Sequence, residues 1–182
     1  IGKKEDKGFE VKATAFVVRD TKRRIMWSLT GSMIHNEDKI IELSPALKKK
    51  YDELLSEGKT LPNTILREGD SQNTIYAVRS LGIDPSTGRE LFLDKNGEVT
   101  YTWSANDRVA CGVNQPKYRG NLSSMFRWKD WVVNVNFAYR LGGQLYNSTL
   151  LSKIEGADKR YNVDERVYND RWQNPGDKTF FK

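Results

Sequence analysis

Alternating apolar and polar positions mark two neighbouring segments near the start of the chain. Every odd-numbered position between residues 8 and 18 is apolar, and most even-numbered positions are polar, although Phe16 and Val18 interrupt the polar series. After the charged segment 19–23, Ile25, Trp27, Leu29, Gly31 and Met33 repeat the alternation. A period of two is typical of a β-strand that has one face in an apolar environment. The pattern predicts a hairpin of strands at about 8–18 and 24–33, joined by a short charged turn.

The same design returns about a hundred residues later along the chain. Segments 118–128 and 131–140 alternate in the same way, and Lys129 and Asp130 separate them. Their second face carries large polar residues, among them Arg127, Asn134 and Arg140. These segments predict a second hairpin with a two-residue turn.

Strand length and aromatic placement favour a membrane barrel over a soluble sheet. Each predicted strand has about ten residues, enough for a tilted strand to cross the hydrocarbon layer of a bilayer. Aromatic residues lie toward the strand ends, where an aromatic girdle is expected; they are Trp27, Phe126, Trp128, Trp131 and Tyr139. Periodicity alone also allows a soluble antiparallel sheet with one solvated face.

The connections differ greatly in length. The turns at 19–23 and 129–130 are short, whereas segments 34–117 and 141–182 are long. Outer-membrane barrels have short periplasmic turns and long extracellular loops. We therefore expect both turns at the periplasmic rim and both long segments outside the cell.

The first long segment has secondary structure of its own. Ser44 is a candidate N-cap and Pro45 fits the first helical position, followed by an apolar stripe at Leu47, Tyr51, Leu54 and Leu55 that ends at Gly58. The lysines at 48–50 are expected on the solvated side of this helix. Strand-like segments at 73–82, 89–93 and 98–103 are separated by turn sequences at 84–88 and 94–97. They predict a small β subdomain.

Composition narrows the functional classes. Hydrophobic residues make up 37% and charged residues 30% of the chain, and the mean hydropathy is -0.70. A formal charge of +6 permits an anionic partner, but no nucleic-acid-binding motif accompanies it, so we expect no nucleic acid. No apolar run reaches the length of a membrane helix. No apolar signal-peptide core follows Ile1, so either the protein is cytoplasmic or its N-terminus is missing.

The sequence offers no catalytic or metal site. Cys111 and His35 are the sole cysteine and histidine, and no nucleophile signature surrounds Cys111. Residues 94–98 look like half a calcium loop but lack the bidentate glutamate of an EF-hand. The acidic pair Asp164 and Glu165 has no apolar neighbourhood to raise a pKa for glycosidase chemistry. We predict a protein that is not an enzyme and that has no cofactor and no metal.

Several short motifs occur in an order and at a spacing that covers most of the chain. They are EG at 68–69, GIDPSTG at 82–88, DKNG at 94–97, NQPKYRG at 114–120, WKDW at 128–131, GGQLYN at 142–147 and DRW at 170–172. Each alone is an ordinary turn sequence, but the series resembles the SusC/RagA family of TonB-dependent outer-membrane transporters. The predicted fold is therefore all-β: part of a large antiparallel transmembrane β-barrel, with a long extracellular loop that carries a short helix and a small β subdomain.

The resemblance implies a bacterial outer-membrane barrel of about 22 strands with a plugged lumen. It implies import of oligosaccharides or oligopeptides together with a SusD-like surface lipoprotein and the TonB complex. Four strands cannot close such a barrel, and their open edges would be unpaired in lipid. We therefore expect that the chain is the C-terminal part of a longer polypeptide. A soluble β-rich module with a basic surface, which binds glycans or another partner, is the alternative function.

Two groups of residues are candidates for solute contact. Aromatic rings in the outer loops can cover the apolar face of a sugar or a peptide side chain; these are Tyr101, Trp103, Tyr146 and Trp172. Packing within the loops is the other interpretation of each ring. Polar residues expected to face the lumen are Asn121, Asn134, Asn136 and Arg140.

Overall fold

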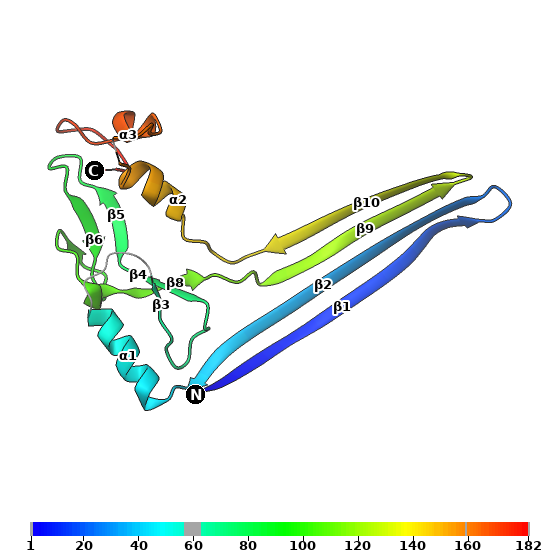
Figure 1. Ribbon diagram of the computed structural model, residues 1–182, viewed down its shortest axis with the longest axis horizontal. Helices are drawn as coiled ribbons and strands as arrows, with labels where there is room; N and C mark the ends of the chain where they lie inside the picture. The colour runs from blue at the N-terminus through cyan, green and yellow to red at the C-terminus, as the bar shows by residue number, and fades with distance from the viewer. Residues whose placement is uncertain (1, 57–62, 159, 182) are drawn as a thin grey trace.

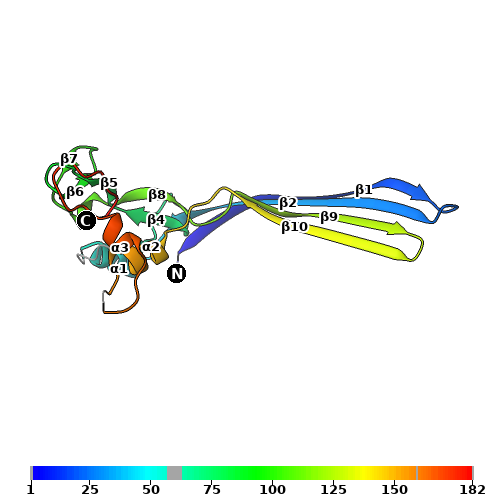
Figure 2. The ribbon, with the colours of Figure 1, turned by 90° about the horizontal axis from the view of Figure 1, so that it is seen from above.

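The protein has two visibly different parts, a long sheet and a group of loops at one end of it. The computed structural model describes residues 2–56, 63–158 and 160–181. Four strands run side by side, and both hairpin turns lie at the end farthest from the loops (Figure 1). The short helices and small sheets gather at the other end, so the sheet is a single layer along most of its length (Figure 2).

The four long strands form one antiparallel sheet. They are β1 (Lys3–Asp20), β2 (Ile25–Glu42), β9 (Tyr118–Trp128) and β10 (Trp131–Leu141), in the order β1-β2-β9-β10. The two predicted hairpins are adjacent, because β2 pairs with β9 from Ile25 opposite Trp128 to His35 opposite Tyr118. The sheet is therefore continuous from β1 to β10, and the long segment between β2 and β9 leaves and returns at the same end.

The first two strands are longer than predicted. Each has 18 residues, and their pairing continues through Lys7 opposite Glu37 to Lys3 opposite Glu42. The alternation disappears in these extensions, since both faces carry charged residues there. A ladder beyond the membrane has water on both sides, so its hydrogen bonds persist while the pattern that reveals it in the sequence is lost. The first outer segment accordingly begins at Leu43.

Register divides the sheet into two unlike faces, because directly paired residues point to the same side. The apolar face is made of Phe9, Val11, Ala13, Ala15 and Val18 of β1, Ile25, Trp27, Leu29, Gly31, Met33 and His35 of β2, Tyr118, Gly120, Leu122, Ser124, Phe126 and Trp128 of β9, and Trp131, Val133, Val135, Phe137, Tyr139 and Leu141 of β10. Many of these side chains are open to the surroundings, and Phe137 is 65% and Trp131 73% exposed. An uncovered apolar surface of this extent is a contact surface.

The polar face carries most of the hydroxyl, amide and charged side chains of this two-faced part of the sheet. It is made of Glu10, Lys12, Thr14, Phe16 and Arg19 of β1, Met26, Ser28, Thr30, Ser32 and Ile34 of β2, Arg119, Asn121, Ser123, Met125 and Arg127 of β9, and Val132, Asn134, Asn136, Ala138 and Arg140 of β10. The predicted group Asn121, Asn134, Asn136 and Arg140 thus shares one face.

A β-bulge in β1 changes the predicted face of its last residues. The register shifts between Phe16 and Val18, so Phe16 lies opposite Ser28 and Val18 lies opposite Trp27. Val17 is the extra residue, and Val18 takes the place on the apolar face that strict alternation gives to Val17. The bulge explains why the sequence pattern is interrupted at this point.

Two polar side-chain groups on the apolar face, in Trp27 and Tyr139, have hydrogen-bond partners within the sheet. The Trp27 indole Nε1 donates to Ser124 Oγ at 3.0 Å. The Tyr139 hydroxyl donates to the backbone oxygen of Ser32 at 2.9 Å. The residue opposite Tyr139 on β9 is Gly120, where a Cβ would collide with that hydroxyl and with the Ser32 backbone. Satisfied polar groups are required in hydrocarbon, where water is absent.

The first outer segment holds a short helix and β structure, as predicted, and the β structure consists of two small sheets. Helix α1 (Pro45–Ser56) begins as predicted, with Lys48 N bonded to Ser44 O at 3.0 Å. One sheet has the order β3-β4-β8 and consists of β3 (Asn63–Thr64), β4 (Thr74–Ala77) and β8 (Val109–Val113). The other sheet has the order β5-β6-β7 and consists of β5 (Arg79–Ile83), β6 (Glu90–Leu93) and β7 (Val99–Thr100). The predicted strand 73–82 is therefore divided at Val78 between two sheets. Gly58 and the side chains of Leu54 and Leu55 lie outside the described residues.

The segment after β10 forms short helical turns around a small core. The turns are α2 (Ser148–Leu150), the π-helical η2 (Leu151–Glu155) and α3 (Arg166–Asn169); the 3₁₀ turn η1 (Ala105–Asp107) belongs to the first outer segment. Ile154, Val167 and Phe181 are buried together. Across the described ranges, none of the helices has the length and apolar character needed to span a membrane.

Candidate functional site

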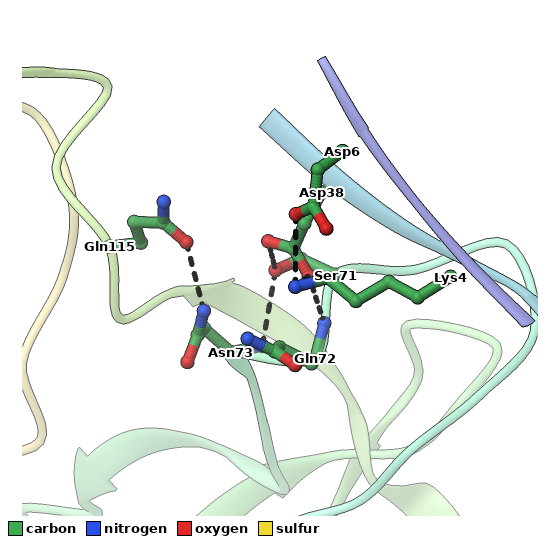
Figure 3. A network of polar contacts seen from close by, with 7 residues as sticks. All are labelled: Lys4, Asp6, Asp38, Ser71, Gln72, Asn73 and Gln115. Atoms are coloured by element: carbon green, nitrogen blue, oxygen red, sulfur yellow. Dashed lines mark hydrogen bonds and ion pairs between the residues drawn. The ribbon is translucent and has the colours of Figure 1, made fainter. Parts of the chain in front are cut away.

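A network of polar side chains joins the first outer segment to the polar side of the sheet (Figure 3). We call it the mouth network; its members are Lys4, Asp6, Asp38, Ser71, Gln72, Asn73 and Gln115. The Asp38 carboxylate accepts from Ser71 Oγ at 2.6 Å and from Gln72 N at 2.8 Å. Its side chain is only 5% exposed, so these charge-assisted hydrogen bonds are shielded from water. Asp38 is therefore an anchor between β2 and the loop that crosses it.

The network extends from Asp38 to the chain that enters β9. Asn73 Nδ2 donates to Gln115 Oε1 at 2.9 Å, and Asn114 N donates to Asn73 O at 2.8 Å. On the other side, the Lys4 ammonium lies 2.9 Å from Asp6 and 3.9 Å from Asp38. The loop thus connects strand β2 to the chain that enters β9, and Lys4 links strand β1 to Asp38 of β2.

Backbone bonds and a buried tyrosine reinforce this connection. Ile40 N donates to Asp70 O at 2.9 Å, and Gly69 N donates to Ile40 O at 2.8 Å. The Tyr76 hydroxyl donates to the Asp70 carboxylate, and the Arg67 guanidinium lies 4.6 Å from the ring centroid of Tyr76. Burial, and next the hydrogen bond to Asp70, raise the pKa of Tyr76 above its usual value, so the phenol stays protonated and remains a donor.

Two open cavities flank the mouth network and share Asn36 and Gln115. One has a volume of about 310 Å³ and lies between the end of β2, strand β8 and the segment after β10, with Lys117 and Gln144 in its lining. The other has a volume of about 530 Å³ and lies over β1 and β2, with Arg119 in its lining. Both volumes are within the range of small-ligand sites, and amide groups line both.

Two of the four predicted aromatic residues meet at one turn. Tyr101 donates its hydroxyl to the Asp84 carboxylate at 2.6 Å, and the Arg89 guanidinium lies 4.5 Å from its ring centroid. Trp172 donates its indole Nε1 to Pro85 O at 2.9 Å. The turn at 84–88 therefore holds both rings, and it fastens the segment after β10 to the first outer segment.

Asp84 organises this turn through its carboxylate. It accepts from Ser86 N at 2.9 Å, Ser86 Oγ at 2.7 Å and Thr87 Oγ1 at 2.8 Å, besides Tyr101. These hydrogen bonds hold the pKa of Asp84 far below its usual range, and the bond from Tyr101 has the largest effect, ahead of those from Ser86 and Thr87. The same bond raises the pKa of Tyr101. The turn is thus built around an ionised carboxylate.

The other two predicted aromatic residues lie apart from this turn. Trp103 is half-buried, and the guanidinium of the buried Arg108 lies 5.8 Å from its ring centroid. Tyr146 is 44% exposed, and partial burial, and next the charge of Glu155, raise its pKa. Within the described ranges, neither ring is hydrogen-bonded to Tyr101 or Trp172 or stacked against them. The four rings are not a single site.

The mouth network was not predicted from the sequence. Asp38 lies in a charged run that resembles an ordinary solvated loop, and its partners Ser71 and Gln72 are more than thirty positions later. The motif EG at 68–69, one of the family-like motifs, is the available sequence signal for this loop. In the part of the chain that the structure describes, no cluster of three or more histidine, cysteine or acidic residues is arranged to hold a metal ion.

Comparisons with known proteins agree with the arrangement of the sheet and loops. No protein-family model matches the chain. The chain is 27% identical over 174 residues to the TonB-dependent receptor P3 of Formosa agariphila, an alignment that covers 86% of this chain and 17% of the receptor. Its fold matches the structure of the RagAB peptide transporter with a TM-score of 0.73 at 21% identity, over 99% of this chain and 20% of that one. A structure of the RagAB peptide importer in the 'closed-closed' state gives a TM-score of 0.68 at 20% identity.

The fold and these likenesses define the class as a section of an outer-membrane β-barrel wall together with its loops. The chain spans about a fifth of the length of the proteins it matches. The resemblance found in the sequence is confirmed, because the chain is similar in sequence to a TonB-dependent receptor and similar in fold to the RagAB transporter. The named relatives are a receptor and a transporter, which agrees with the prediction that the chain is not an enzyme.

Proposed function

We propose that this chain forms part of the wall and outer mouth of a transporter that imports oligosaccharides or oligopeptides across the outer membrane. In this proposal, the apolar face contacts lipid, the polar face lines the lumen, and the loops face the outside of the cell. The complete protein works with a SusD-like surface lipoprotein and draws energy from the TonB complex. The chain itself performs no covalent chemistry.

The two-faced sheet is the observation that carries the proposal. The 11 residues of β9 rise about 34 Å along the strand, and a tilt of about 40° reduces this to about 26 Å across the membrane. An apolar band about 25 Å tall is characteristic of outer-membrane barrels. Aromatic rings mark its two limits, Tyr118 and Tyr139 near the loops and Trp128 and Trp131 near the turns. A soluble module would leave this band exposed to water.

The mouth network supports a role for the loops at the entrance to the lumen. It lies on the polar side of the sheet, beyond the apolar band, and Asp38 holds the 67–73 loop against the ends of β1 and β2. A loop fixed in this way narrows the barrel entrance without depending on a mobile hinge. Amide groups around the two cavities suit the hydroxyls of a sugar or the main chain of a peptide.

The predicted solute contacts fit this proposal to different degrees. Tyr101 and Tyr146 are the stronger candidates, because both residues are exposed whereas Trp172 is half-buried. Trp103 packs beside Arg108. Along the lumen, Asn121, Asn134, Asn136 and Arg140 present donors and acceptors to a passing solute.

Uptake by cells that express the complete protein tests the function. Labelled oligopeptides and oligosaccharides are supplied to cells that carry the protein, to cells that lack it, and to cells in which TonB is inactive. We expect accumulation of one solute class only when both the protein and TonB are present. Equal accumulation of every probe in all three strains would contradict the proposal.

A further inference from the structure

Two arginines face one another directly on the polar face, just below the mouth network. Arg119 of β9 and Arg140 of β10 are cross-strand partners, so their Cα atoms lie about 5 Å apart and both side chains point to the same side. Both are exposed. Like charges placed directly opposite one another destabilise a sheet. A negatively charged partner would offset this repulsion.

That partner is not found in this part of the protein. Among residues 2–56, 63–158 and 160–181, no ion pair or side-chain hydrogen bond involves either guanidinium. The carboxylate in the same row of the sheet is Glu10, which lies opposite Ile34, and Ile34 lies opposite Arg119. Glu10 is thus two strands from Arg119, or about 10 Å at the normal strand spacing.

The rest of the polar face adds to the positive charge. Between Glu10 and the hairpin turns it carries Lys12, Arg19 and Arg127, while Glu10 is its one carboxylate in this stretch, which the structure describes in full. A surface with an excess of one sign of charge concentrates solutes of the opposite sign. Rings of arginine and lysine select anions in pores by the same effect.

A cavity opens beside one member of the arginine pair. The cavity of about 530 Å³ includes Arg119 in its lining, and its other charged residues are Lys4, Lys7, Asp6 and Glu10. Lys4 is already paired with Asp6, and Lys7 with Glu5, each at 2.9 Å. Arg119 is therefore the cation of this lining that has no carboxylate partner within the described residues.

We propose that Arg119 and Arg140 form an anion-binding pair that takes a carboxylate or sulfate group of an acidic oligosaccharide or oligopeptide. The proposal rests on the transport function proposed above and names the charge of the solute. A guanidinium presents a planar fork of donors that matches the two oxygens of such a group. Two adjacent forks bind one anion with four donors, and the bound charge relieves the repulsion between the arginines.

Binding to the purified complete protein tests the pair. The probes are two matched sets: trigalacturonate with its neutral methyl ester, and a glutamate-rich pentapeptide with its glutamine counterpart. We expect the acidic member of one set to bind more tightly than its neutral match, and salt to weaken only the acidic probe. The Arg119→Gln, Arg140→Gln double variant is expected to weaken that binding roughly tenfold to hundredfold, as for the loss of hydrogen bonds to a charged group.

Matched variants distinguish specific binding by Arg119 and Arg140 from a general effect of positive charge on the protein. Lys22→Gln with Arg23→Gln removes two cations from a hairpin turn and is expected to leave binding unchanged. Arg119→Lys with Arg140→Lys keeps the charge but loses the forks, so its affinity should lie between those of the wild type and the glutamine variant. The set of probes that responds, sugar or peptide, identifies the source of the anionic group.

Unchanged acidic-probe affinity in the glutamine variant would overturn the proposal. If that variant also has a lower melting temperature, an acidic side chain of the remaining barrel or plug is the partner instead of a solute. If TonB-dependent uptake of neutral probes continues while no acidic probe binds, the anion pair is wrong and the transport function stands. If no probe of either kind is taken up, the transport function itself fails.

Discussion

Asp38 is the point at which loss of one side chain should release the loop from the sheet. Its carboxylate accepts two hydrogen bonds, from Ser71 Oγ at 2.6 Å and Gln72 N at 2.8 Å, with 5% of the side chain exposed. A hydrogen bond to a charged group contributes about 1.5 kcal/mol or more, so Asp38→Ala should cost about 3 kcal/mol locally. That corresponds to an increase of about 100-fold in the opening equilibrium of the loop.

Hydrogen exchange of the complete protein in detergent measures this opening. Amides in segment 67–73, including Gly69 and Gln72, should exchange about 100-fold faster in Asp38→Ala, because local opening controls their exchange. Asp6→Ala is the matched control: its side chain is 66% exposed and pairs with Lys4 alone, so we expect a change of less than about fivefold. Exchange in 67–73 within about threefold of the wild type would refute the anchoring role.

Three further substitutions test the turn and the membrane-facing bond. Asp84→Asn should let pepsin cut near the 84–88 turn at about pH 4.5, whereas the wild type should resist until the pH falls below about 4. The reason is that the pKa of Asp84 is lower in the folded protein than in the unfolded chain. The ionised carboxylate therefore stabilises the fold at a pH above the pKa of the unfolded chain, and this contribution is lost in acid. Gly88→Ala should cost about 2 kcal/mol or more, since φ is +68° and the new Cβ would lie 2.5 Å from the Trp172 ring, and tryptic cleavage of segment 160–181 should accelerate. Tyr139→Phe removes the hydroxyl bond to Ser32 O and should lower the free energy of unfolding by about 1 kcal/mol, measured as the urea midpoint in detergent.

The strands could be predicted because a membrane imposes strict alternation on them. The predicted bounds of β9 agree with the structure, and those of β10 differ by one residue. Prediction was less accurate where that constraint ends. The charged extensions of β1 and β2 lie beyond the apolar band, and the bulge at Val17 changes the face of one position without a change in composition. The small sheets were merged because Val78 divides them with no glycine or proline to mark the boundary.

The polar contacts at the mouth depend on the path of the loop, which the sequence pattern does not encode. Asp38 and Ser71 meet because residues 67–73 return across β2, and nothing in the run NEDK at 36–39 distinguishes Asp38 from its neighbours. The aromatic residues show the same limit. Their rings make Tyr101 and Trp172 candidates for solute contact, and the structure reveals that their polar atoms bind the 84–88 turn. The sequence does not mark Arg119, because its significance comes from its partner Arg140 on the adjacent strand.

The assignment of the two faces is tested most directly by placing single cysteines at consecutive positions of β10. In the complete protein, with Cys111→Ser as background, Val133→Cys and Asn134→Cys are treated in intact outer membranes with a small charged thiol reagent. Val133 lies on the apolar face and Asn134 on the polar face. We expect rapid labelling at position 134 and almost none at 133, because hydrocarbon excludes the reagent. Equal labelling at both positions, or the reverse order, would contradict the barrel-wall assignment.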